Sequence, residues 1–194
     1  MKKLVKIFLN KVCNIFIYSF VFKGKIEYKS FNSIGIPDFT IAPHGEIIND
    51  GYIEMVNTAR MSTLGKANRC KLAIFDNAIL HFYGKVGMSN TTIIATKKIE
   101  IGNNVMIGGG VIIVDTDFHS LDYINWFSPN DQLLMIRKSV KIGDNVFLGM
   151  DSIILKGVTI GDGAIVAAGA VVSRDIPQNE IWGGNPARFI KKRQ

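Results

Sequence analysis

The sequence contains few cysteines, the residues that stabilise a fold through disulfide bonds or bound zinc. Only two cysteines, Cys13 and Cys70, occur in 194 residues, and they form no CxxC pair. A disulfide scaffold or a zinc ribbon is therefore disfavoured, and the expected compartment is a reducing one, the cytoplasm. No low-complexity tract is present, and 47% of the residues are hydrophobic against 20% charged. This composition excludes a disordered chain and predicts one well-buried domain with a small appendage.

Nucleic-acid recognition motifs are also missing, although the net charge is +7. Residues 1–30 carry most of this charge, with seven lysines against one glutamate, and the remainder of the chain is nearly neutral. Neither a helix-turn-helix pattern nor an aromatic-plus-basic surface motif accompanies the lysines, so we expect no nucleic-acid partner.

Residues 1–30 are predicted to be a segment distinct from the body at 31–194. Their polar side chains recur at spacings of three and four, which predicts an amphipathic helix. Lys11 and Asn14 interrupt the apolar run and no small-residue cleavage site follows, so neither a membrane span nor a signal peptide is expected. Two interpretations stay open. The helix packs on the protein itself or a neighbouring subunit, or residues 1–24 contact the anionic inner face of the membrane.

The body of the chain repeats every six residues. Nine aliphatic residues keep this spacing, with one interruption: Ile101, Ile107, Ile113, Ile142, Leu148, Ile154, Ile160, Val166 and Val172. A small or β-branched residue follows most of them four positions later, as Val105 follows Ile101. Glycine, asparagine and aspartate fill the positions between, in "GNN", "GDN" and "GDG".

A period of six fits neither the 3.6 of a helix nor a long flat strand. It predicts short strands joined by tight corners, three to a triangular coil, with each aliphatic side chain pointing into the shaft. Corner residues are expected to be glycine, asparagine or aspartate because these tolerate left-handed backbone conformations. Successive coils would stack by parallel hydrogen bonding into one continuous core.

The interruption falls at "VDTDFHSLD", residues 114–122, and the repeat resumes at Val140. A loop of this length inside a compact solenoid is usually functional. It carries His119, one of only three histidines. The chain then ends in "SRDIPQNEIWGGNPARFIKKR".

These features resemble those of the hexapeptide-repeat acyltransferases, which build left-handed parallel β-helices. The similarity is closest to the sugar O-acetyltransferases, a branch that includes maltose, galactoside, capsule and O-antigen acetyltransferases, and it covers residues 75–194 well. The resemblance implies an all-β fold with an extruded loop at 115–139. A short C-terminal helix at 185–194 is expected to cover the last coil, with Pro186 in its first turn.

The resemblance makes His119 the catalytic base. Acyl transfer from a thioester to a hydroxyl requires removal of the hydroxyl proton, and a neutral imidazole suits this role near pH 7. Asp117 is the predicted orienting group of the imidazole, although Asp115 or a backbone carbonyl could serve as well. Trp126 and Phe127 in the same loop would stack on the acceptor sugar or anchor the loop to a neighbouring subunit.

The resemblance also implies acetyl-CoA as the acyl donor, bound in a groove between the subunits of a homotrimer. The matching positions are the corner residues Gly149, Met150, Ala167 and Ala168 and the basic residues Arg174, Arg188 and Lys191. A metal site is not expected. The related γ-class carbonic anhydrases bind zinc through two histidines five residues apart and a third from a neighbouring coil, whereas His44, His81 and His119 are widely separated.

We therefore expect a CoA-dependent O-acetyltransferase that modifies a saccharide hydroxyl, for example on a surface polysaccharide or its precursor. Two other functions remain open. One is N-acylation of an amino sugar nucleotide in the same fold, and the other is a non-catalytic β-helix scaffold at the membrane.

Overall fold

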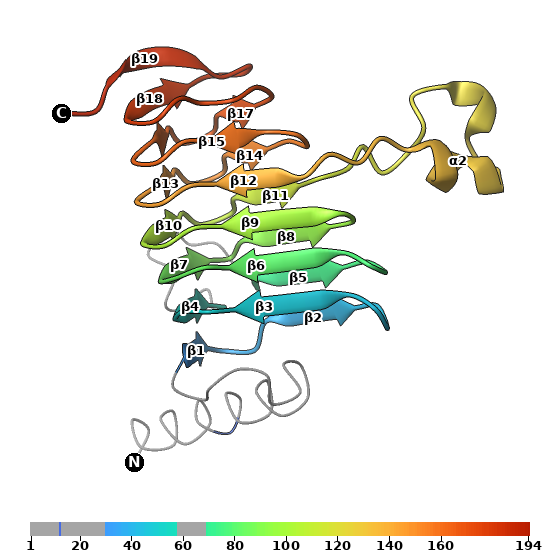
Figure 1. Ribbon diagram of the computed structural model, residues 1–194, viewed down its shortest axis with the longest axis horizontal. Helices are drawn as coiled ribbons and strands as arrows, with labels where there is room; N and C mark the ends of the chain where they lie inside the picture. The colour runs from blue at the N-terminus through green and yellow to red at the C-terminus, as the bar shows by residue number, and fades with distance from the viewer. Residues whose placement is uncertain (1–11, 13–29, 58–68) are drawn as a thin grey trace.

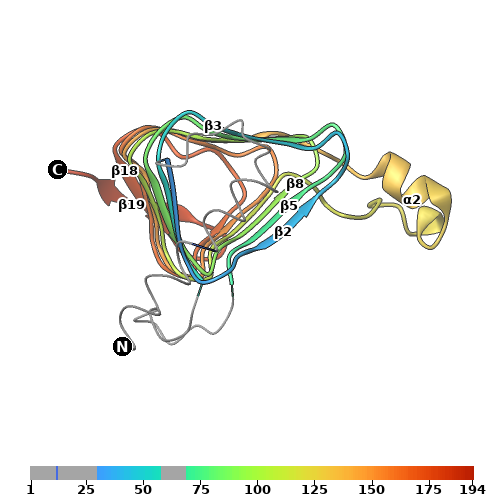
Figure 2. The ribbon, with the colours of Figure 1, turned by 90° about the horizontal axis from the view of Figure 1, so that it is seen from below.

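In the computed structural model the chain is a left-handed parallel β-helix, in which short strands wind round a triangular prism (Figures 1 and 2). The structure describes residue 12 and residues 30–57 and 69–194. The predicted N-terminal helix lies outside these residues. Within them, no helix has the length and apolar character needed to cross a membrane.

Each side of the prism is one sheet, and the three sheets are called A, B and C here. Sheet A contains β1 (Phe31–Ile34), β4 (Ile53–Val56), β7 (Val86–Ser89), β10 (Val105–Ile107), β13 (Phe147–Leu148), β16 (Ile165–Val166), β18 (Glu180–Gly183) and β19 (Arg188–Lys192). Sheet B contains β2 (Asp38–Ile41), β5 (Lys71–Ile74), β8 (Thr92–Ala95), β11 (Ile112–Val114), β14 (Ile153–Ile154) and β17 (Val171–Val172). Sheet C contains β3 (Glu46–Asn49), β6 (Ile79–Phe82), β9 (Lys98–Ile101), β12 (Val140–Ile142) and β15 (Thr159–Ile160).

The core follows the six-residue repeat. All nine repeating aliphatic side chains are buried, with at most 2% of their surface exposed. The residues four positions later are buried as well, including Val105, Ser152 and Ala164. One apolar cluster therefore runs the length of the prism and holds the three sheets together.

Side-chain oxygens join successive coils at the corner between sheets C and A. Asp144 Oδ1 accepts a hydrogen bond from the Asn103 N–H of the preceding coil (2.8 Å), and Asp162 Oδ1 accepts one from the Asp144 N–H (2.9 Å). Each oxygen lies directly over a glycine of the coil before it. A Cβ on Gly102 would collide with the Asp144 carboxylate, and one on Gly143 with that of Asp162.

The left-handed conformation predicted for corner glycines is found at Gly110, Gly157, Gly163 and Gly169, but two other corner glycines have a different role. Gly102 and Gly143 do not adopt left-handed backbone conformations. The left-handed residues at this corner include Asn104 and Asn145, each with φ of 57°, and Gly163, with φ of 68°. These two glycines are needed for space, because the side chain of the next coil occupies the position of a Cβ.

The C-terminus also differs from the prediction, since residues 185–194 contain no helix. β19 (Arg188–Lys192) instead runs antiparallel to β18 and becomes the edge of sheet A. A strand satisfies the backbone groups along the open edge of β18, which a helix would leave unpaired. The backbone N–H of Arg193 donates to the Asn179 carbonyl (2.8 Å), which holds the C-terminal residues against the last coil.

Replacement of Gly143 by alanine should destabilise the prism. The added Cβ overlaps the Asp162 carboxylate, and overpacking of this kind costs about 1–3 kcal/mol. Gly87→Ala is the matched control, because a Cβ at that strand position meets no atom within 4 Å. We expect a melting temperature several degrees lower for Gly143→Ala and an unchanged or slightly higher one for Gly87→Ala. Equal melting temperatures for the two variants would contradict the account of the corner.

Candidate active site

The extruded loop leaves the prism at the corner between sheets B and C on a two-stranded stem. β11 ends at Val114 and β12 begins at Val140, so the loop occupies residues 115–139. The Lys138 N–H donates to the Asp115 carbonyl (2.9 Å), and the Asp117 N–H donates to the Ile136 carbonyl (3.2 Å). The stem fixes both ends of the loop, which stands clear of the coils (Figures 1 and 2).

Asp115 is fully buried at the base of the stem and serves the fold. Its Oδ1 accepts from the N–H (2.7 Å) and hydroxyl (2.8 Å) of Thr96. Its Oδ2 accepts from the N–H groups of Lys97 and Lys98, both at 2.8 Å. All these donors lie on the preceding coil, so Asp115 secures the corner from which the loop departs and does not contact His119.

His119 is paired with Asp131 from the far side of the loop. The imidazole Nδ1 lies 2.6 Å from Asp131 Oδ2, and the Ser120 N–H donates to Asp131 Oδ1 (2.7 Å). The carboxylate can only accept, so Nδ1 carries a proton, and in the neutral imidazole Nε2 then holds the lone pair. The His119 side chain is 70% exposed while that of Asp131 is 10% exposed. A buried carboxylate therefore holds an imidazole whose reactive edge faces outward.

The short helix α2 (Pro129–Leu134) delivers Asp131 to this position. Ser128 caps its N-terminus by accepting a hydrogen bond from the Asn130 N–H, and Pro129 occupies the first turn, where its missing N–H costs nothing. Asp131 follows in the same turn. The hydrogen bonds from His119 and from the Ser120 N–H hold the pKa of the Asp131 carboxyl below its ordinary value, so it is ionised at neutral pH.

The predicted pairing of Asp117 with His119 is not the one observed. Asp117 Oδ1 lies 2.5 Å from Lys156 Nζ on the next coil, and both side chains are largely buried. Asp117 Oδ2 is buried without a hydrogen-bond partner. The reason is geometric, because the Asp117 side chain turns back toward the prism from the stem whereas His119 lies farther out. Asp117 thus ties the stem to the coil above it.

Trp126 and Phe127 have different environments within the loop. The indole N–H of Trp126 donates to the carbonyl of Ser120 (2.8 Å), whose own N–H binds Asp131. Phe127 is wholly exposed in a left-handed conformation, with φ of 60°. Trp126 therefore braces the His119 region from within the loop, while Phe127 is available to a substrate or a neighbouring subunit.

The four corner residues predicted to contact the acyl donor lie together, between sheets A and B. The Gly149 N–H donates to the Val166 carbonyl and the Gly169 N–H to the Met150 carbonyl, both at 2.8 Å. A Cβ on Gly149 would collide with the backbone of Ala167 and Ala168. Gly149 is therefore buried under the next coil, whereas Ala167 is half-buried and Met150 and Ala168 are exposed.

The structure brings only one predicted basic residue to this corner. Arg188 lies opposite Gly183, which packs against Ala167. Lys191 lies farther along β19, opposite Ile181 on sheet A. Arg174 follows β17 and lies at the corner between sheets B and C, near the loop stem. The three are exposed but do not form one cluster.

The other two histidines each have an aspartate partner of their own. His44 Nδ1 lies 2.9 Å from Asp76 Oδ1, and His81 Nε2 lies 2.6 Å from Asp50 Oδ2. Among residues 30–57 and 69–194, no group of three or more histidine, cysteine or acidic side chains is placed to hold a metal ion.

Comparison with known proteins identifies the class. Residues 139–174 match the family described as "Bacterial transferase hexapeptide (six repeats)". WbbJ of Escherichia coli K12, which carries the name of a lipopolysaccharide biosynthesis O-acetyl transferase, is 32% identical over 75% of this chain and 74% of its own. A Schizosaccharomyces pombe protein named as an acetyltransferase is 40% identical over 61% of this chain and 56% of its own.

A solved structure agrees with these relatives. A hexapeptide-repeat acetyltransferase from Vibrio cholerae O1 biovar eltor, determined with acetyl coenzyme A, is 28% identical, with a TM-score of 0.54 over 64% of this chain and 65% of its own. The fold and the interrupted repeat thus define a hexapeptide-repeat β-helix protein. The chain belongs to the hexapeptide-repeat transferase family. It spans about half the length, 48–56%, of most of the first curated relatives it matches.

Protonation of Asp131 at low pH should break its ion pair with His119 and destabilise the conformation of the loop. The pKa of this carboxyl is lower in the folded protein than its ordinary value, near 3.9. Its contribution to loop stability is therefore fully present above the ordinary value. That contribution is lost as the pH falls through the lower pKa of the folded protein. Trp126 emission, recorded in a Trp182→Phe background, reports the loop. We expect Asp131→Asn to show at pH 7 the emission that the parent shows only below about pH 4.

Asp122→Asn is the control for this titration, because Asp122 caps a short helix at Tyr123–Asn125 without touching His119. It should keep the parent's pH profile. Identical profiles for the parent and Asp131→Asn would rule out the role of the ion pair in holding the loop.

Proposed function

We propose that this protein is an acetyltransferase that moves the acetyl group of acetyl-CoA to a hydroxyl of a saccharide. The His119–Asp131 pair carries the proposal. It presents an imidazole of fixed tautomer on a loop outside the coils, and no residue that the structure describes bonds to its Nε2. A base in this state can accept a hydroxyl proton near neutral pH.

His119 would work in two steps. Nε2 takes the proton of the acceptor hydroxyl as its oxygen attacks the thioester carbonyl, and the imidazolium returns the proton to the departing sulfur. Asp131 is ionised beside Nδ1 and stabilises the positive charge that develops on the ring between these steps. Asp117 would act indirectly, because its ion pair with Lys156 keeps the stem at a fixed height on the prism.

The corner between sheets A and B suits the acyl donor. Ala168 is exposed there and stacks on the buried Gly149, so its small side chain would allow close approach of the pantetheine arm, whose amides would pair with corner peptide groups. Met150, 39% exposed, borders the same strip. Arg188, opposite Gly183 at this corner, would meet phosphate, and Arg174 and Lys191 would extend the positive field along the prism.

A second copy of the chain would complete the site. His119 stands on a loop with many exposed apolar side chains, of which Leu121, Ile124 and Leu133 are each more than 70% exposed. Packing against neighbouring subunits in a homotrimer would cover them and bring a donor corner to each loop. The acceptor would be a saccharide of a surface polysaccharide or its precursor, acetylated on the cytoplasmic side. Residues 1–24 would make the peripheral membrane contact.

Replacement of His119 by alanine should lower kcat by at least about 10²-fold, since general-base assistance is lost. The acetyl-CoA dissociation constant and the assembly state should not change. His44→Ala is a close control, because His44 is 73% exposed and also pairs with an aspartate. Turnover can be followed as thiol release with maltose, a galactoside and an amino sugar as acceptors. Near-parent turnover by His119→Ala would refute the assignment, and preference for the amine would favour N-acylation.

Loss of the Arg188 guanidinium should weaken acetyl-CoA binding by about tenfold or more, the usual worth of a hydrogen bond to a charged group. Calorimetry with Lys192→Ala, on the same strand, provides the control. Parent protein that binds no acetyl-CoA at millimolar concentration would remove the acyltransferase proposal and leave the scaffold function.

A further inference from the structure

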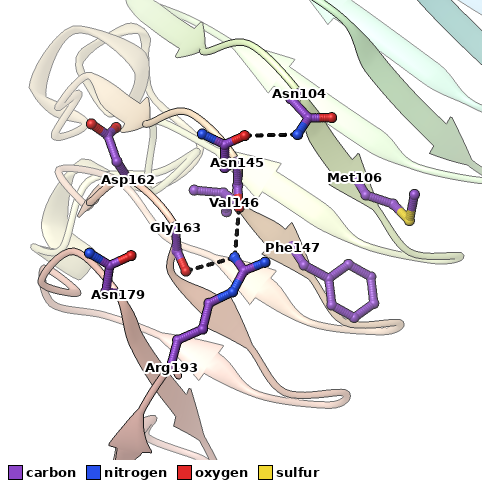
Figure 3. Close-up of a pocket in the computed structure, with 9 residues that line it drawn as sticks. All are labelled: Asn104, Met106, Asn145, Val146, Phe147, Asp162, Gly163, Asn179 and Arg193. Carbon is purple, nitrogen blue, oxygen red and sulfur yellow. Dashed lines mark hydrogen bonds between the residues drawn. The ribbon is translucent and has the colours of Figure 1, made fainter.

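A cavity of about 450 Å³ lies at the third corner, between sheets C and A, and none of the predicted site residues lines it. It is therefore separate from His119, which leaves the B–C corner, and from Met150 at the A–B corner. Its walls come from four successive coils and from the C-terminal tail (Figure 3).

Arg193 closes one side of this cavity. Its Nη1 donates to the Asn145 carbonyl (3.0 Å) and the Gly163 carbonyl (2.9 Å), which holds the guanidinium in place. Its other terminal nitrogen is directed toward Phe147 (Figure 3). The guanidinium is thus immobilised by one nitrogen and keeps further N–H donors for the cavity.

Asparagine side chains form the polar wall. The Asn104 amide donates through Nδ2 to Asn145 Oδ1 (2.8 Å), which leaves Asn104 Oδ1 as an acceptor and Asn145 Nδ2 as a donor. Asn179 adds a third amide from the last coil. The wall therefore offers both donors and acceptors, which suits hydroxyl groups because each of them both donates and accepts.

The charge of the cavity is balanced. Asp162, which uses Oδ1 to accept the Asp144 N–H, and Arg193 both line the cavity. One carboxylate and one guanidinium give a net charge near zero. A phosphate or a carboxylate would meet Asp162 at a cost, whereas a neutral ligand would not.

The remaining wall is apolar and exposed. Met106 and Phe147 are register partners on β10 and β13, and they keep 63% and 40% of their surfaces exposed. An aromatic ring beside polar amides offers a face for the C–H side of a sugar ring.

We propose that this cavity binds a neutral oligosaccharide at a site distinct from the catalytic one. Phe147 would stack on a sugar ring, while the asparagine amides, Asp162 and Arg193 would bind its hydroxyls. The inference extends the proposed function by giving the acceptor a second point of attachment, as a polymeric substrate would need.

Methionine methyl groups provide a separate reporter for each site. Met106 lies in the cavity, Met150 on the donor corner, and Met135 on the catalytic loop, where its sulfur accepts a hydrogen bond from Thr116 (3.5 Å). Full-length protein with ¹³C-methyl methionine would be titrated with maltotriose, lactose and acetyl-CoA, after assignment by Met→Leu substitution. We expect saturable movement of the Met106 signal with at least one oligosaccharide and of the Met150 signal with acetyl-CoA.

Phe147→Ala should weaken the Met106 response about tenfold or more, because the stacking surface is lost. Phe75→Ala is the matched control, since this phenylalanine is 47% exposed on the corner between sheets B and C. His119→Ala should retain the Met106 response in full, which separates the cavity from catalysis.

The outcomes distinguish the two proposals. No movement of Met106 with either oligosaccharide up to its solubility limit, or movement that survives Phe147→Ala, overturns the oligosaccharide site. Movement of Met135 alone also overturns it while leaving the acceptor at the catalytic loop. Failure of acetyl-CoA to move Met150 counts against the proposed donor corner and has no bearing on the cavity.

Discussion

The fit of one coil's carboxylate or amide over the glycine of the previous coil is the contact on which the prism depends. Along the corner between sheets C and A, the oxygens of Asp144 and Asp162 bond backbone N–H groups of the coil before them. Those groups would otherwise be left without strand partners where the chain turns, and an unpaired backbone group is costly. Glycine at positions 102 and 143 is the condition for this contact, because any Cβ would displace the oxygen. Hydrophobic stacking alone would not fix the coils at one height.

Hydrogen bonds of the same kind allow the extruded loop to leave the prism. At the corner between sheets B and C, the aspartates of later coils again bind N–H groups of earlier ones, as Asp76 binds His44 and Asp175 binds Thr159. Asp115 performs this task for Thr96 and Lys97 and is at the same time the first residue of the loop. The corner is therefore complete before the chain departs. The loop can extend outward without exposing unpaired backbone, and its stem begins from a rigid point.

The core of the prism and the exit of the loop could be predicted because a six-residue period indicates which side chains face inward. The nine aliphatic positions and the exit of the loop follow from local sequence, and both are observed. Contacts between distant positions do not follow. Asp117 lies two residues from His119, yet it pairs with Lys156, and the partner of His119 is Asp131, twelve residues on. Ser128 and Pro129 are typical of a helix start, and Asp131 lies in the first turn of that helix. The position of the Asp131 carboxylate relative to His119, however, depends on the fold of the whole loop. The terminal strand was missed because β18 offers an edge that favours pairing over helix formation.

Pairing with aspartate does not distinguish His119, since all three histidines in the chain are paired in this way at 2.6–2.9 Å. Their settings differ. His81 is 16% exposed and stacks on Tyr83, so its ring belongs to the outer surface of sheet C. His44 is as exposed as His119, but its own N–H is bound by the Asp76 carboxylate that contacts its ring, which ties it to the corner of the first coil. Asp131 instead arrives from a helix within the extruded loop, so the pair at His119 moves with the loop and faces away from the prism. Position on an element that leaves the repeat, more than the ion pair itself, distinguishes His119 as the candidate base.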